Sequence, residues 1–239
     1  MKFGYLIEPP FNYVDANGHV TGPDVELARH VCRELGVSAF EPVETEFAEL
    51  LPGLNRGLWR MTTGLFSTHE RQRTAQFSRP IWALPDGLLV QAGNPLKLSG
   101  YRSIAAHLTA RLAVIRDQIQ HRSAVAGGVP ESRIVVFDTY TQAARTVRDG
   151  ITDAYASVGR AHGGFINQNP DWAVEMVLVD PDEKPPAFGS FAFSLGDTAL
   201  LRDINAVLGD FLGTDTHRQM VAEFGFSDAE VDLVCRPMP

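Results

Sequence analysis

The sequence predicts an α/β protein built of two lobes, and three features of the chain support this fold class. Short apolar runs alternate with segments of helical periodicity, an order typical of parallel sheets covered by helices. The alternation occurs twice, in the first third of the chain and again in its middle. Two extended segments, near residues 83–90 and 187–193, flank the second occurrence and are expected to be crossovers. We therefore expect lobe 1 to span residues 1–84 and 190–239, with lobe 2 inserted at residues 85–189.

The first lobe is expected to begin with a buried strand over residues 2–7. Residues 12–18 are typical of a small hairpin, because Asn17-Gly18 favours a tight turn. Pro23 is placed to open a helix whose apolar residues recur at helical spacing, and Gly36 to end it. The other elements expected in this lobe are a helix at 47–56, a strand at 61–63, and helices at 199–212 and 216–224.

The second lobe shows the same kind of alternation. Strands are predicted at residues 112–115, 134–137, 154–158 and 175–179. Helices are predicted at residues 101–107, after Gln118, at 141–149 with Gly150 as the stop, and around Phe165.

Composition places the chain among ordinary globular proteins. With 239 residues, 44% of them hydrophobic and 21% charged, it can bury a proper core. A net charge of −8 and the lack of a basic run argue against nucleic-acid binding. No apolar run approaches the ~20 residues needed to span a bilayer, and the N-terminus does not read as a leader. The two alternatives are a cytoplasmic protein or an exported one whose leader has been removed.

The two cysteines, Cys32 and Cys235, have neither metal-ligand spacing nor a CxxC partner. They form one disulfide if the C-terminal tail returns to the first helix. Otherwise they are two unrelated thiols.

Residues 64–77, GLFSTHERQRTAQF, are the strongest candidate for a binding element. The stretch is expected to run from a small-residue turn into a charged helical start, with Arg71 just inside it. Free backbone N–H groups and a planar guanidinium suit the two oxygens of a carboxylate. The alternative is a surface arginine paired with Glu70 or Glu49.

An aromatic set and one acid accompany this candidate. Phe11, Phe47 and Phe66 are expected to form a box around a delocalised cation, each face contributing ~0.5–2 kcal/mol. Ordinary core packing is the alternative for all three. Glu8 beside such a box would pair with the positive end of a zwitterion held by Arg71 at its other end. A solvated turn residue is the alternative for Glu8.

Several motifs, taken in this order and spacing, resemble one family. They are PPFNYVDANGHVTGPDVELA at residues 9–28, LPGLNRG at 51–57, TGLFSTHERQRTAQFSRP at 63–80 and FDTYTQAARTVRDGITDAY at 137–155. The chain resembles the type II periplasmic solute-binding proteins of polar amino-acid ABC importers. Within that family it looks most like the ectoine and hydroxyectoine binders, on residues 8–11, 64–66 with 70–71, and 93–96.

The resemblance implies a ligand cleft between the two lobes, closed by a hinge motion. It makes Arg71 the carboxylate clamp and places ligand-binding residues in both lobes. Those expected are Glu8, Phe11, Phe47, Gly64, Phe66 and Arg71 in lobe 1, and Arg116, Gln118, Ile119 and Ser157 in lobe 2, with Asp117 and Phe188 as further candidates.

The sequence also departs from the family pattern. Residues 116–119 replace the Gly-Thr loop of lobe 2, and Val158 stands where an aspartate normally holds an α-ammonium group. Phe66 replaces a hydroxyl residue. These changes count against an ordinary α-amino acid as the ligand, and the altered loop also counts against ectoine.

The function expected is binding and delivery, with no catalytic residues, metal or cofactor. The expected partners are a small zwitterion and a membrane ABC permease, and the expected state is a monomer in the periplasm or at the extracellular membrane face. An amino acid or a derivative of one is the alternative ligand. A dehydratase or lyase on the same scaffold, of the cyclohexadienyl type, is the enzyme alternative.

Overall fold

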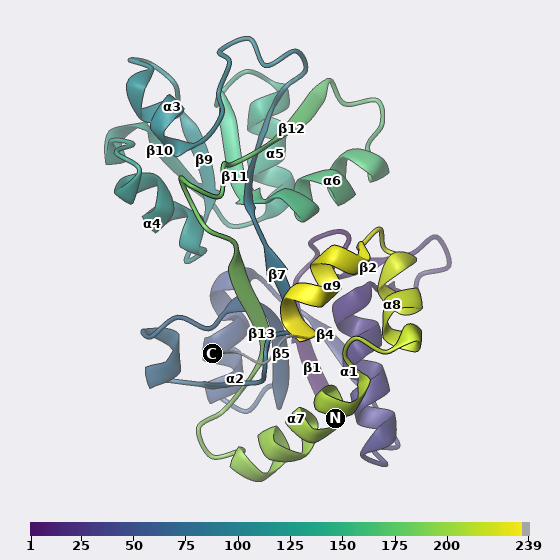
Figure 1. Ribbon diagram of the computed structural model, residues 1–239. Coiled ribbons are helices and arrows are strands. Elements are labelled where there is room, and N and C mark those ends of the chain that lie inside the picture. The colour runs from purple at the N-terminus through teal and green to yellow at the C-terminus, as the bar shows by residue number, and fades with distance from the viewer. Residues whose placement is uncertain (236–239) are drawn as a thin grey trace. The chain divides into compact units, whose positions relative to one another are not determined.

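The computed structural model describes residues 1–235, which fold into two compact units (Figure 1). The first unit contains Met1–Ala83 together with the chain from Phe188 onward. The second unit is Leu84–Ala187. Each unit has its own sheet and its own covering helices, and each is described separately below.

The sheet of the first unit has the strand order β4-β1-β5-β13-β6, and β7 also pairs with β13. Strand β1 is parallel to both β4 and β5, whereas β13 is antiparallel to β5 and β6. The sheet is therefore mixed, and the expected parallel pairing holds only for its first three strands. The bounds are β1 Lys2–Tyr5, β4 Glu41–Glu44, β5 Met61–Phe66, β6 Gln76–Phe77, β7 Trp82–Leu84 and β13 Ala187–Phe193.

Helix α1 of this unit begins at Pro23 as predicted and ends at Glu34, two residues before Gly36. The hairpin at Asn17-Gly18 is also present, formed by β2 (Tyr13–Val14) and β3 (Val20–Thr21). The strands β4 and β6 and the last helix were not predicted. The remaining helical elements are η1 Phe47–Glu49, α2 Leu50–Asn55, η2 Arg71–Arg73, α7 Thr198–Phe211, α8 Asp215–Ala222 and α9 Asp228–Cys235.

Trp59 fills the space between α2 and the sheet of the first unit. Its Nε1 donates to the carbonyl of Leu50 at 3.0 Å. A Cβ added at Gly4 or at Gly53 would lie 2.5 Å or 2.1 Å from the Trp59 ring, so the indole requires glycine at both positions. Packing against Trp59 thus accounts for Gly53, the first glycine of the motif LPGLNRG.

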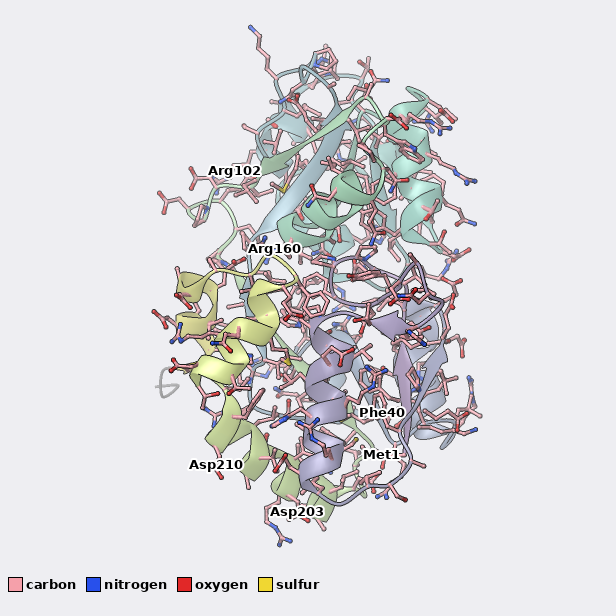
Figure 2. The ribbon with its side chains drawn as sticks, turned by 90° about the vertical axis from the view of Figure 1, so that its right-hand side faces the viewer. Met1, Phe40, Arg102, Arg160, Asp203 and Asp210 are labelled. Carbon is pink, nitrogen blue, oxygen red and sulfur yellow. The ribbon has the colours of Figure 1, made fainter. Side chains whose placement is uncertain are left out.

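Phe40, labelled in Figure 2, stands directly before β4. Its ring centroid lies 5.6 Å from that of Phe3 and 5.5 Å from the guanidinium carbon of Arg29 in α1. The segment that precedes β4 is therefore held against α1 and β1.

The sheet of the second unit has the order β10-β9-β11-β8-β12. The three strands β10, β9 and β11 are parallel, and β8 runs antiparallel to both of its neighbours. The bounds of β9, β10 and β11 are those predicted from the sequence. The strands are β8 Asp86–Gln91, β9 Leu112–Ile115, β10 Ile134–Phe137, β11 Ala154–Val158 and β12 Val174–Leu178.

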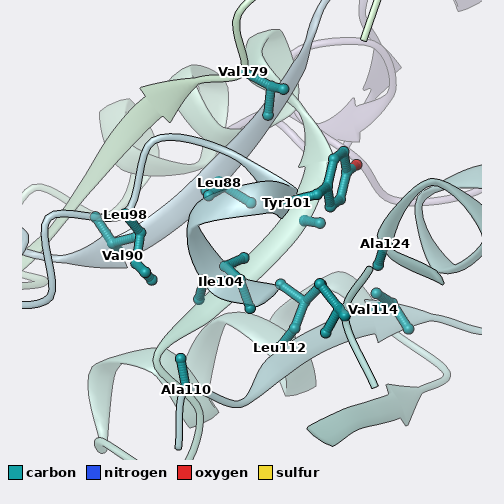
Figure 3. Packing of buried hydrophobic residues seen from close by; sticks show 13 residues of the cluster. Leu88, Val90, Leu98, Tyr101, Ile104, Ala110, Leu112, Val114, Ala124 and Val179 are labelled. Atoms are coloured by element: carbon teal, nitrogen blue, oxygen red, sulfur yellow. The ribbon is translucent and has the colours of Figure 1, made fainter. Parts of the chain in front are cut away.

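Buried side chains from three strands, two helices and the loops between them form the core of the second unit (Figure 3). Leu88, Leu112 and Val114 of the sheet pack against Tyr101 and Ile104 of α3. The helical elements here are α3 Tyr101–Ala106, α4 Ile119–Ala126, η3 Glu131–Arg133, α5 Tyr140–Arg148 and α6 Gly159–Gln168.

Both cysteine thiols are free, so the disulfide alternative is wrong and the two are unrelated. Cys32 is buried in α1, and burial raises its pKa to about 11. Among residues 1–235, no helix is both long enough and apolar enough to cross a bilayer.

Candidate functional site

The candidate site begins at a bulge in β5. Ser190 faces Leu65 and Ala192 faces Thr62, so one residue of β13 opposes two residues of β5. Gly64 occupies the bulge with φ of 78°, a left-handed conformation that favours glycine. The predicted turn at residues 64–66 is therefore wrong, because the strand continues through Phe66. The role of Gly64 in the structure is to shape the strand that carries Phe66.

The segment after β5 folds back on itself, which places Arg71. The N–H of Thr68 and the Nη1 of Arg71 both donate to the carbonyl of Phe66, at 2.9 and 3.1 Å. The hydroxyl of Thr68 accepts from the N–H of Arg71 at 3.3 Å. The expected helical start is a single 3-10 turn, η2. Arg71 is thus held by its own loop.

Arg71 also lies over an aromatic ring. Its guanidinium carbon is 5.2 Å from the centroid of Phe47, within the range of cation–π attraction. Glu49, which the sequence allowed as a partner of Arg71, instead pairs with Arg56. The structure therefore brings together three of the predicted site residues, namely Arg71, Phe47 and Phe66.

Phe11 and Phe66 meet through a ring that the sequence reasoning missed. The Trp82 centroid lies 5.5 Å from that of Phe11 and 5.4 Å from that of Phe66. Phe226 packs edge-on against the far side of Phe11 at 5.8 Å. We call Phe11, Phe66, Trp82 and Phe226 the aromatic cluster.

Glu8 precedes Phe11 of this cluster by three residues and is buried. Its backbone exchanges two hydrogen bonds with that of Asn12, closing the turn that leads into Phe11. The alternative of a solvated turn residue is thus wrong, because the Glu8 side chain is 6% exposed. Burial of a carboxylate favours pairing with a cation.

Asp24, in the first turn of α1, is the second buried acid here. Its Oδ2 accepts from the Thr63 hydroxyl at 2.6 Å and its Oδ1 from the Trp82 Nε1 at 3.2 Å. Burial, with a smaller contribution from the nearby Glu8 carboxylate, raises the pKa of Asp24 to about 7 against the lowering effect of the hydrogen bonds from Thr63 and Trp82. The sequence carried a signal for this residue, since its spacing from Ala28 and Val31 puts a carboxylate on the apolar face of α1.

The second-unit candidates lie on two elements. Gln118 stands at the N-cap position of α4 without a side-chain capping hydrogen bond and is 7% exposed, and the next residue, Ile119, opens the helix. Arg116 is exposed and pairs with Asp138 at 2.7 Å. Ser157 is buried in β11, where it faces Gly87 of β8. Their roles toward a ligand stay predictions.

The comparison with known proteins decides the family. The profile of the bacterial extracellular solute-binding proteins, family 3, matches residues 1–227. The chain belongs to this family. The two mixed sheets are those of its type II fold, and membership confirms the prediction of a ligand-binding protein rather than an enzyme.

Relatives and solved structures agree with this assignment. A probable amino-acid ABC transporter periplasmic-binding protein of Sinorhizobium fredii is 29% identical over 225 residues, which are 92% of this chain and 74% of the relative. Arginine-binding protein 1 of Escherichia coli is 23% identical, over 89% of this chain and 84% of its own. A crystal structure of EhuB in complex with hydroxyectoine superposes with a TM-score of 0.87 and 26% identity, covering 99% of this chain and 94% of that one.

No metal site accompanies these residues. Across the described chain, residues 1–235, no three His, Cys, Asp or Glu side chains are grouped so that they would hold an ion. Arg71, the aromatic cluster and Glu8 form instead a set suited to a small organic ion with separated charges.

Proposed function

We propose that this solute-binding protein serves an ABC importer outside the cytoplasm and binds a small zwitterion whose cation is delocalised or quaternary, of the ectoine or hydroxyectoine kind. The observation that carries the proposal is the arrangement around Phe66. Its carbonyl holds Arg71, and its ring packs on Trp82, which also contacts Phe11.

Each part of this arrangement has a role toward such a ligand. The Arg71 fork suits a carboxylate, because two parallel N–H groups match two oxygens. The faces of Phe47 and the aromatic cluster suit the cation, because ring faces carry partial negative charge. The buried Glu8 supplies the opposite full charge. The similarity to EhuB, solved with hydroxyectoine, supports this choice of ligand class.

An α-amino acid with a delocalised side-chain cation, such as arginine, is the second candidate. Relatives named as arginine-binding proteins support it. A guanidinium group would also suit the aromatic faces and Glu8. Against it, Val158 ends β11 where the family pattern expects an acid for the α-ammonium group, and valine offers no partner for that charge.

Calorimetric titration of the purified chain with ectoine, hydroxyectoine, arginine, glutamine and histidine tests the proposal. We expect ectoine or hydroxyectoine to bind more tightly than arginine, and glutamine and histidine not to bind. Tighter binding of arginine would replace the first candidate by the second. Binding of none of the five would overturn the proposed ligand class.

Two pairs of variants then locate the site. Arg71→Ala should abolish binding, whereas Arg73→Ala, in the same 3-10 turn, should leave it unchanged. Glu8→Gln should weaken ligands with a full positive charge, whereas Glu41→Gln, on the surface beside Lys2, should not. Undiminished binding by Arg71→Ala would show that the carboxylate is held elsewhere.

A further inference from the structure

Trp82 occupies the centre of the aromatic cluster. It contacts Phe11 and Phe66, whereas no direct ring contact joins those two among the aromatic pairs of the described residues. The Phe66 ring meets Trp82 edge-on, at 80° between planes, and the Phe11 ring is tilted by 45°. Both phenylalanine rings therefore share one indole as a direct neighbour.

The indole is fixed by a hydrogen bond as well as by packing. Its Nε1 donates to Asp24 Oδ1 at 3.2 Å, and Asp24 is anchored in turn by the Thr63 hydroxyl on β5. Both polar groups are buried, so neither finds water as a substitute partner. Strand β5 and helix α1 thus hold the ring from one edge.

The opposite constraint comes from β13. A Cβ added at Gly189 would lie 1.9 Å from the Trp82 ring, closer than any side-chain contact. The ring therefore lies directly on the backbone of β13. The Gly189 backbone covers one face of the indole, and a hydrogen bond to Asp24 holds one edge. Together these contacts restrict rotation of the ring.

From these contacts we infer that Trp82, locked by Asp24, is the positioning residue that sets the angle of the Phe11 and Phe66 faces and thereby the selectivity of the site for a delocalised over a localised cation. The inference takes its ligand class from the proposed function. The packing of Trp82 against Phe11 and Phe66 is independent of which ligand binds. Cation–π attraction depends on the cation lying over the ring face, so a rotated phenylalanine loses it.

The first test needs no ligand. Ring resonances of Phe11 and Phe66 are assigned by NMR in the wild type and in Trp82→Leu, with Trp59→Phe as the matched control. Trp59 is also a buried indole whose Nε1 donates to protein, but it packs between Gly4 and Gly53, away from the cluster. Because loss of the indole ring current alone moves these resonances, the readout is the set of NOE contacts that each phenylalanine ring makes with residues other than 82. We expect Trp82→Leu to change these contacts for both rings and Trp59→Phe to change them for neither. Unchanged contacts in Trp82→Leu would overturn the inference, whatever the protein binds.

The second test concerns the hydrogen bond from the Trp82 indole to Asp24. Asp24→Asn keeps an oxygen acceptor for the indole, whereas Asp24→Ala removes it. We expect the indole N–H signal of Trp82 to stay protected from exchange in Asp24→Asn and to exchange faster in Asp24→Ala. Equal protection in the two variants would show that packing alone holds the ring.

The third test is selectivity, measured with ectoine and with glycine betaine against β-alanine, whose ammonium is localised. We expect Trp82→Leu to weaken the first two by about tenfold, the loss expected for one cation–π contact, and β-alanine by less. Trp59→Phe should leave all three unchanged. Equal losses for all three ligands would overturn the selectivity claim. If the wild type binds none of them, the proposed function is overturned, and the NMR comparison of the first test alone decides the positioning role of Trp82.

Discussion

The guanidinium carbon of Arg71 lies 5.2 Å from the centre of the Phe47 ring, while its Nη1 donates to the carbonyl of Phe66. The side chain is therefore oriented by its surroundings before any ligand arrives. Less rotational freedom is lost on binding when the binding group is already held. Phe47 thus contributes to the candidate site in two ways, as a ring face and as a support for the arginine.

Phe47→Leu is expected to weaken binding of a carboxylate zwitterion by roughly 3- to 30-fold, the range that corresponds to one cation–π contact of ~0.5–2 kcal/mol. Titration calorimetry measures the change. Phe40→Leu is the matched control, because Phe40 also lies beside an arginine, Arg29, but precedes β4, whereas Phe47 follows it. An equal loss in both variants would indicate a general loss of folding.

Asp24→Asn is expected to stabilise the protein above neutral pH. The folded pKa of Asp24 is raised to about 7 by burial, above its unfolded value, so the folded state keeps the proton longer. Stability therefore falls as pH rises from about 4 to about 7, by at most about 1.4 kcal/mol per pH unit. In denaturant unfolding, the free energy of unfolding of the variant relative to that of the wild type should be higher at pH 8 than at pH 5. A constant difference at both pH values would contradict the raised pKa.

His217→Asn is expected to make the protein more resistant to acid. Burial lowers the pKa of His217 to about 4, and its Nδ1 accepts from the N–H of Gly213 at 3.1 Å. Because the unfolded chain takes up the proton first, stability is lost as pH falls from about 6.5 to about 4. The Asn oxygen can accept the same hydrogen bond without titrating. Melting temperatures across this window test the claim, and a variant of the exposed His69, His69→Asn, should follow the wild type.

Gly64→Ala is expected to destabilise the protein by roughly 1–2 kcal/mol, because φ of 78° is costly for a residue with a Cβ. The new Cβ would also lie 2.9 Å from the Cδ2 of Leu6. Thermal unfolding measures the loss. Gly196→Ala serves as the control, since an added Cβ there meets nothing within 4 Å and φ is not positive. An equal effect of both changes would remove the argument from backbone strain.

Local signals predicted much of the fold. Pro23 set the start of α1, and the bounds of β9, β10 and β11 follow from apolar runs between turn residues. The prediction was wrong where a local rule was overridden. Gly64 suggests a turn by itself, but pairing with β13 carries the strand through it as a bulge. Helix α9 was missed although a capping box marks its start: the Ser227 hydroxyl accepts from the Glu230 N–H at 3.4 Å, and the Glu230 carboxylate accepts from the Ser227 N–H at 2.9 Å.

The candidate site was predicted in its residue types and only in part in its contacts. Arg71, Phe47 and Phe66 lie together as expected. Trp82 was missed because its position in the sequence says only that a crossover begins. Its partner Asp24 was passed over because one acid in a long helix is usually solvated. Contacts between residues so distant in sequence depend on the packing of α1 against β5 and β7, which no local pattern records.

The contact of Gly189 with the Trp82 ring has a consequence for how sequences of this kind can diverge. The indole leaves no room for even a methyl group at position 189, and a methyl group there would displace the indole. Neither position can therefore change freely while the other stays fixed. A homologue with a small side chain at position 82 is free to carry alanine at 189, and the two substitutions should be inherited as a pair.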